Sequence, residues 1–262
     1  MADFSGGLAS RRSPALAVVL FSQPLGGVLA VALALVLGET SLPPADILWS
    51  LLAGLSGPTA LVFFYRGLAS GRMGVVAPVA GVLGAAIPVV VGSVLQGQPA
   101  PIQLAGIALA LGSVALVTRT VDGARSGPSG LGLALIAGSG FGAFFVFLGQ
   151  VGSGAAFAPL VVVRIAATLL MAAVVVVSRS PWRLSRASIL PAIVAGTLDM
   201  GGNLGYVLAA QQGRLDMAAV LASLYPVVTI LLAAAVLREH IGRLQAVGIA
   251  GALAAIVLIA AG

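Results

Sequence analysis

Long uninterrupted runs of apolar residues are the feature of this sequence that most restricts its fold. Several of them extend for about 18 residues or more, the length at which an apolar segment becomes a candidate transmembrane helix. Of the 262 residues, 60% are hydrophobic and 8% are charged, too few charges to cover a soluble domain. The runs are also too long for the strands of an outer-membrane barrel, which have about 10 residues. We therefore predict an all-α polytopic membrane protein.

The apolar runs predict nine complete membrane spans, separated by short segments rich in Arg, Pro and Gly. Each has about 18 to 24 residues, and a helix needs about 20 to cross the hydrocarbon layer. The longest connection, residues 119–128, is interpreted as a linker. The predicted spans are residues 14–37, 46–66, 73–95, 101–118, 129–150, 156–178, 188–210, 216–237 and 244–261.

An internal repeat is indicated when the chain is compared with itself at an offset of 142 residues. Two successive five-helix units must be inserted with opposite orientations, the inverted-repeat plan of many secondary transporters. We expect residues 1–118 to form the first repeat, 119–128 the linker and 129–262 the second repeat. The matching positions include Ala53-Gly54 with Ala195-Gly196, Gln103 with Gln245, and Gly106 with Gly248.

The same offset predicts that most of the first helix of the first unit is absent. The second unit begins with the span 129–150, and the offset places the counterpart of this span before residue 1. Residues 2–10 would then be the end of a truncated helix, in a ten-helix plan with nine complete helices and an N-terminal stub. The alternative is that residues 2–10 never belonged to a helix.

The basic residues predict the orientation of the chain. All 13 are Arg, and 11 of them lie in alternate connections between spans. By the positive-inside rule these connections face the cytoplasm, which would place the C-terminus outside. This distribution does not resemble a nucleic-acid-binding face, so no nucleic-acid partner is expected. We assign the chain to the cytoplasmic membrane as a multi-pass monomer or homodimer.

Two ionisable residues, Arg164 and Asp199, lie deep inside predicted spans. A charge at such a depth costs about 2.5–3.5 kcal/mol on insertion scales and generally marks a functional site. Asp199, Asn203 and Tyr206 are spaced i, i+4, i+7 and therefore share one helix face, while Arg164 and Thr168 stack on the preceding span. Either Arg164 binds an anionic group and Asp199 binds an amine or relays a proton, or the two form a structural ion pair.

Other polar and small residues give weaker signals. Gln23 in the first complete span, and Ser223 and Tyr225 beside a proline, are further candidates for substrate contact. The chain has one His and no Cys, and nothing in it resembles a phosphate-binding loop, so we expect no metal, no cofactor and no enzymatic activity. The pairs Gly138/Gly142 and Gly201/Gly205 are interpreted as helix-packing faces.

The second unit resembles a known family. The run from Leu198 to Tyr206 (LDMGGNLGY) looks like the eighth helix of the drug/metabolite transporter superfamily. The run Ser223-Leu224-Tyr225-Pro226, followed by Leu237-Arg238-Glu239, is similar to the signature of the ninth and tenth helices in its EamA-type branch. The resemblance covers essentially the whole chain. It departs from the family at the first helix and at Gly97, which occupies the position corresponding to Glu239.

The resemblance implies two inverted five-helix repeats around a central substrate cavity, with alternating access. The resulting hypothesis is a secondary active transporter that exports small metabolites or drugs, with Asp199 as the candidate for proton coupling. The expected partners are a small-molecule substrate, the lipid bilayer and protons. The alternatives are a non-transporting scaffold or truncated paralogue, and a lipid-linked sugar flippase of the same fold.

Overall fold

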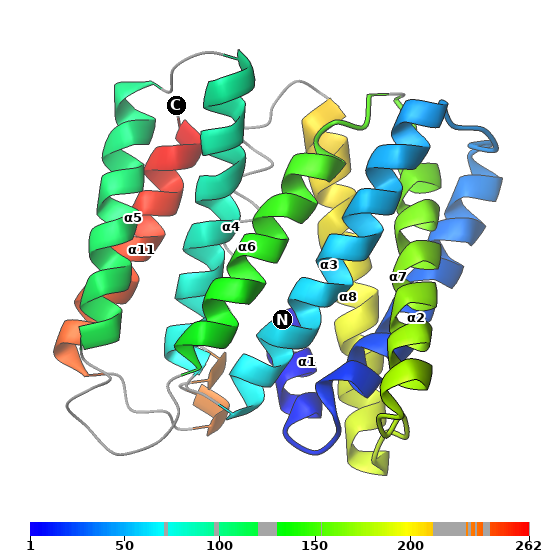
Figure 1. Cartoon of the computed structure of the whole chain (residues 1–262), viewed down its shortest axis with the longest axis horizontal. Helices are drawn as coiled ribbons and strands as arrows, with labels where there is room; N and C mark the ends of the chain where they lie inside the picture. The colour runs from blue at the N-terminus through cyan, green and yellow to red at the C-terminus, as the bar shows by residue number, and fades with distance from the viewer. Residues whose placement is uncertain are drawn as a thin grey trace.

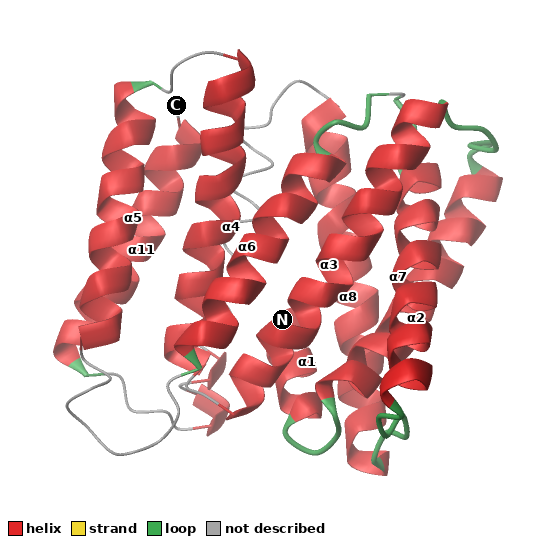
Figure 2. Ribbon diagram, viewed as in Figure 1, coloured by secondary structure: helices red, strands yellow, loops and turns green. Residues whose placement is uncertain are grey.

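The computed structural model describes residues 1–70, 73–96, 100–119, 130–152, 154–211 and 242–261, with a few further positions between 229 and 237. Within these ranges all regular secondary structure is α-helical (Figures 1 and 2). The helices are α1 (Ala2–Ser10), α2 (Ala15–Val36), α3 (Pro44–Ser70), α4 (Met73–Gln96), α5 (Pro101–Arg119), α6 (Leu131–Leu148), α7 (Phe157–Ser178), α8 (Arg186–Gln211) and α11 (Arg243–Ala261).

The all-α polytopic membrane fold is confirmed. Among the described helices, α2, α3, α6 and α7 are long and apolar enough to cross a membrane, and shorter apolar stretches occupy Val75–Pro88, Pro101–Ser113 and Ala246–Ile259. Large apolar side chains such as Val28, Val36 and Val177 are exposed on the outside, as contact with lipid tails requires. The two inverted repeats, and the division at 119–128, stay predictions.

Most helix ends agree with the predicted spans, but two helices are longer. Helix α3 extends from Pro44 to Ser70 and α8 begins at Arg186, because a charged residue such as Arg66 or Arg186 interrupts an apolar run without ending the helix. Pro44 suits the first position of α3, where its missing N–H has no partner to lose. Residues 2–10 form the short helix α1. The predicted span 216–237 lies almost entirely outside the described residues.

The helices pack in an order that differs from their order in the sequence. Helix α1 packs against α8 and α3, α2 against α7 and α8, and α3 against α6 and α7. Helices α5 and α11 form a second group beside α4, which contacts α6 (Figure 1). Segments far apart in the sequence therefore surround the space between α1, α3, α6, α7 and α8.

Glycines allow several of these helices to approach closely. An added Cβ at Gly196 of α8 would lie 2.5 Å from the Ser22 carbonyl oxygen of α2. An added Cβ at Gly138 would lie 2.7 Å from Leu83 Cβ and one at Gly142 would lie 2.6 Å from Ile87 Cβ, so this pair packs on α4 as predicted. Gly201 and Gly205 have no described neighbour within 4 Å of an added Cβ and face a cavity instead.

Among the described residues, the arginines outside the cavity lie at one end of the bundle. The turn from α1 to α2, the connection from α7 to α8 and the start of α11 lie at one end, the lower end in Figure 1. The connection from α2 to α3 and the C-terminus lie at the other end. The lower end carries Arg11, Arg12, Arg179, Arg183, Arg186 and Arg243, and the upper end carries Glu39 and Asp46.

Candidate functional site

A cavity of about 490 Å³ lies among helices α1, α2, α3, α6, α7 and α8. Its volume is within the range usual for sites that bind small molecules. Gly201, Gly202 and Gly205 form part of its α8 wall, and their lack of side chains leaves the space open. Most of the remaining lining is apolar, and the polar lining residues are Asp3, Gln23, Arg164, Asp199, Asn203 and Tyr206.

Arg164 and Asp199 form an ion pair at the wall of this cavity. The Arg164 Nη1 and Asp199 Oδ2 atoms are 2.8 Å apart, which joins α7 to α8. The same Nη1 donates a hydrogen bond to Oε1 of Gln23 on α2. The Arg164 side chain is 3% exposed and that of Asp199 is 22% exposed, so the carboxylate faces the cavity and the guanidinium lies behind it.

Two glycines of α2 make room for the buried arginine. An added Cβ at Gly26 would lie 3.2 Å from Arg164 Nε, and one at Gly27 would lie 3.3 Å from Arg164 Cβ. Among the described residues, Arg164 Nε and Nη2 have no hydrogen-bond partner. Because a buried N–H without a partner is costly, Arg164 depends strongly on its two contacts through Nη1.

The polar stripe predicted on α8 lies together along the cavity wall. Asn203 Nδ2 donates to Asp199 Oδ2 at 3.4 Å, one helical turn away. The Tyr206 hydroxyl donates to the carbonyl oxygen of Phe145 at 3.1 Å, and the two rings lie 4.9 Å apart between centroids. Asp199, Asn203 and Tyr206 therefore share one face, as their spacing predicts.

The other predicted candidates differ in their placement. Gln23 lines the cavity and holds Arg164. Thr168 instead donates its hydroxyl to the Arg164 carbonyl oxygen at 2.7 Å, within its own helix. Ser223 and Tyr225 lie outside the described residues.

Residues 128–261 match the model of the EamA-like transporter family, which is just over half of the chain and includes Arg164 and Asp199. The chain belongs to the EamA-like transporter family. This confirms the resemblance of the second unit and gives the protein a membrane transporter-like function. Proteins of the EamA family are transporters rather than enzymes. No curated protein matches the sequence of the chain.

A solved structure shares the fold of this EamA-like transporter along nearly its whole length. Described as "Crystal structure of protein", it superposes with a TM-score of 0.65 and covers 99% of this chain and 96% of its own. The two sequences are 16% identical, so the likeness concerns the fold alone.

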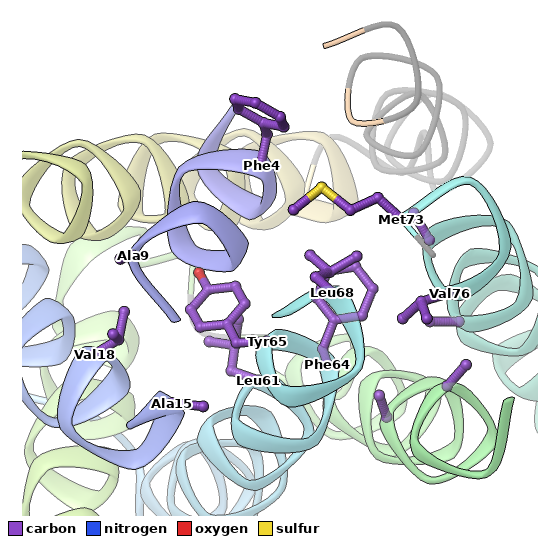
Figure 3. Close-up of a cluster of buried hydrophobic side chains, with 14 of the residues drawn as sticks. Phe4, Ala9, Ala15, Val18, Leu61, Phe64, Tyr65, Leu68, Met73 and Val76 are labelled. Carbon is purple, nitrogen blue, oxygen red and sulfur yellow. The ribbon is translucent and has the colours of Figure 1, made fainter. Parts of the chain in front are cut away.

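Asp3 is a cavity residue of the EamA-like transporter that the sequence patterns missed. It lines the cavity from α1, the short helix that precedes the first complete predicted span. The sequence signal that could have indicated Asp3 is the pair Gly6 and Gly7 after it. Glycines on a helix allow another helix to approach closely, and here they allow α1 to pack against α3. An added Cβ at Gly6 would overlap the Tyr65 ring, whose hydroxyl points toward α1 in Figure 3.

Glu39 is a second residue that the patterns missed, at the upper end of the bundle. Its carboxylate accepts hydrogen bonds from the N–H groups of Ala156 at 3.1 Å, Phe157 at 2.7 Å and Ala158 at 2.9 Å. These are unpaired donors at the start of α7, where a negative charge also favours the helix dipole. Glu39 thereby holds the connection from α2 to α3 on α7, the helix that carries Arg164.

Proposed function

We propose that the protein is a secondary active transporter that moves small molecules through this cavity by alternating access. We further propose that it acts in the cytoplasmic membrane and exports its substrates, the direction that the resemblance to drug/metabolite transporters implies. We also propose that the arginine-rich end of the bundle, the lower end in Figure 1, faces the cytoplasm, in accordance with the positive-inside rule.

The observation that carries the transport proposal is the one-sided exposure of the Arg164–Asp199 pair. A pair whose only role is to join two helices gains nothing from an opening to a cavity. Here the Asp199 side chain is 22% exposed while the Arg164 side chain is 3% exposed. Ionisable groups at this depth usually line substrate or proton pathways. We assign substrate contact and proton coupling to Asp199, and assign to Arg164 the role of fixing that carboxylate and its charge.

Transport by the purified protein in proteoliposomes tests this proposal. A panel of labelled small metabolites should identify a substrate whose flux depends on an imposed pH gradient and falls to background in Asp199→Asn. The charge-swapped double variant Arg164→Asp/Asp199→Arg should stay inactive, because it restores the pair but not the carboxylate position. Recovery of transport in the swapped variant would favour a purely structural pair. Thr59→Val is the control, because its exposed hydroxyl bonds only within α3.

The same experiment separates the alternatives. A non-transporting scaffold predicts no flux for any compound, although the purified protein is folded. A lipid-linked sugar flippase predicts movement of a labelled lipid between leaflets without flux of soluble metabolites.

A further inference from the structure

We propose that the arginine-rich end of the bundle binds one anionic phospholipid, with its phosphate on Arg12, Arg183 and Arg186 and an acyl chain along α2. These three arginines, with Trp182 and Phe21, are called the lipid site below. The inference goes beyond the transport function and does not depend on it, because it concerns the lipid-facing surface. The residues that line the cavity include none of these five.

Serine hydrogen bonds bring together the two segments that carry the arginines, the turn from α1 to α2 and the connection from α7 to α8. The Ser185 N–H donates to Ser13 Oγ at 2.9 Å, and Ser13 Oγ donates to Ser188 Oγ at 3.0 Å. Ser13 and Ser188 are buried, so this joint is fixed. Arg12 precedes Ser13 and Arg186 follows Ser185, and both arginines are exposed. Two arginines that are distant in the sequence therefore lie on the surface of one joint.

A stack of aromatic rings continues from the third arginine to α2. The guanidinium carbon of Arg183 lies 5.8 Å from the centroid of the Trp182 ring. The Trp182 ring stacks on that of Phe21, with centroids 6.4 Å apart and planes inclined by 18°. Both rings are exposed, and tryptophan is typical of the membrane–water interface. A cation–π contact of this kind holds the guanidinium at the level of the lipid headgroups.

The outer face of α2 suits an acyl chain. Phe21, Leu25 and Val28 are spaced i, i+4, i+7 and therefore share one face, and all three are exposed. Helix α2 is long and apolar enough to cross a membrane. The arginines, the aromatic rings and this face therefore follow one another in the order of the phosphate, the glycerol and the acyl chain of a phospholipid. A soluble phosphate would use the arginines alone.

The charge of this end favours an anion. Among the described residues, the carboxylates are Asp3 and Asp199 in the cavity and Glu39 and Asp46 at the upper end. Arginine binds phosphate oxygens in a bidentate geometry, and basic clusters at the ends of membrane helices bind anionic headgroups. Phosphatidylcholine carries the same phosphate, but its choline cation is repelled by arginine. The site should therefore prefer a lipid with a net negative charge.

Trp182 reports directly on its own lipid neighbours. The chain has two tryptophans, so Trp49→Phe leaves Trp182 as the only one. This full-length variant is reconstituted in phosphatidylcholine vesicles with a small fraction of a lipid that carries bromine on its acyl chains, because bromine quenches a nearby indole. Quenching titrations should give brominated phosphatidylglycerol an apparent association constant about tenfold or more above that of brominated phosphatidylcholine. Equal constants would overturn the inference.

Soluble phosphate separates the two sources of the same chemistry. Glycerol 1-phosphate in excess should leave the preference for phosphatidylglycerol in place, because it cannot use the apolar face of α2. Loss of the preference would assign the arginines to a soluble phosphate and overturn the lipid site.

Arginine variants separate a defined site from general surface charge. Arg183→Gln and Arg186→Gln should each lower the preference about fivefold, the effect of one arginine near a membrane surface. Arg243→Gln is the matched control, because it removes the same charge at the same end from α11, which packs against α5 and α4. It should leave the preference at Trp182 unchanged. An equal fall in Arg243→Gln would show attraction by surface charge alone and overturn the site.

The second tryptophan provides a spatial control. In Trp182→Phe the reporter is Trp49, near the start of α3 at the upper end, where its ring lies 6.0 Å from that of Phe147. Both brominated lipids should quench Trp49 equally. The difference in quenching between the wild type and Trp182→Phe also gives the Trp182 signal if Trp49→Phe does not fold. A preference at Trp49 as large as that at Trp182 would contradict a site at the arginine-rich end.

Discussion

The guanidinium of Arg164 and the carboxylate of Asp199 meet at 2.8 Å between α7 and α8, with only the carboxylate open to the cavity. Gln23 of α2 completes the contacts of the arginine, so three helices meet at one buried charge. Removing either partner leaves the other with an uncompensated charge in a medium of low dielectric constant. The pair therefore contributes to stability and also sets the charge that a ligand meets.

We predict that Asp199→Asn lowers the free energy of unfolding by about 3–5 kcal/mol, because it leaves the Arg164 charge buried without its counter-ion. Replacing both residues by apolar ones, as in Arg164→Met/Asp199→Leu, should restore most of that stability, since neither charge then remains to be solvated. Unfolding followed by circular dichroism in detergent measures both.

Transport in proteoliposomes provides the contrasting measurement for the same variants. The double variant Arg164→Met/Asp199→Leu should be stable and still fail to transport, because the cavity has lost the Asp199 carboxylate. Wild-type flux in this variant would show that the pair has no part in transport.

A second prediction concerns the docking of α1. Gly6→Ala should displace α1, because the new methyl group would overlap the Tyr65 ring. The displacement should lower transport in proteoliposomes, because α1 contributes Asp3 to the cavity wall, although every charge is retained. Flux of the identified substrate, compared between the variant and the wild type, measures the effect.

Gly112→Ala is the matched control for this substitution. Position 112 lies on α5 with no described atom within 4 Å of an added Cβ. Alanine should therefore keep the wild-type flux and stabilise the helix by up to about 1 kcal/mol. Unchanged flux in Gly6→Ala would separate the position of α1 from transport.

The membrane fold could be predicted from the sequence because hydrocarbon imposes a simple rule on it. A chain that crosses lipid must pair its backbone within helices, so runs of apolar residues show directly where the helices lie. The predicted spans 73–95 and 101–118 match α4 and α5 to within one residue at each end. The end of α3 and the start of α8 were missed because Arg66 and Arg186 interrupt an apolar run without ending the helix.

The site could be predicted only where its residues share one helix. The face formed by Asp199, Asn203 and Tyr206 follows from helical periodicity alone. Asp3 reaches the cavity because α1 packs against α3 and α8, a contact between distant segments that no local pattern encodes. The bond between Glu39 and the start of α7 was missed for the same reason, because it joins residues more than 110 positions apart.

A third prediction concerns Glu39. Glu39→Ala removes the acceptor of three N–H groups at the start of α7 and should lower the free energy of unfolding by about 1–2 kcal/mol. Glu39→Gln keeps one oxygen acceptor without the charge and should lower it less. Hydrogen exchange measured by mass spectrometry should speed up in peptides covering residues 156–158 in Glu39→Ala. Unaltered exchange there would show that other groups satisfy the start of α7.

The last prediction tests the orientation that the arginines imply. The sequence contains no Cys, so single cysteines report their own side of the membrane. Thr40→Cys, in the connection from α2 to α3, should react with a membrane-impermeant maleimide on intact cells. Pro181→Cys, in the arginine-rich connection from α7 to α8, should react only after permeabilisation, because the positive-inside rule retains that connection in the cytoplasm. Val28→Cys, exposed on the apolar exterior of α2, should stay unlabelled in both conditions, since hydrocarbon suppresses the reactive thiolate. The reverse pattern at positions 40 and 181 would invert the assigned orientation and place Glu39 on the cytoplasmic side.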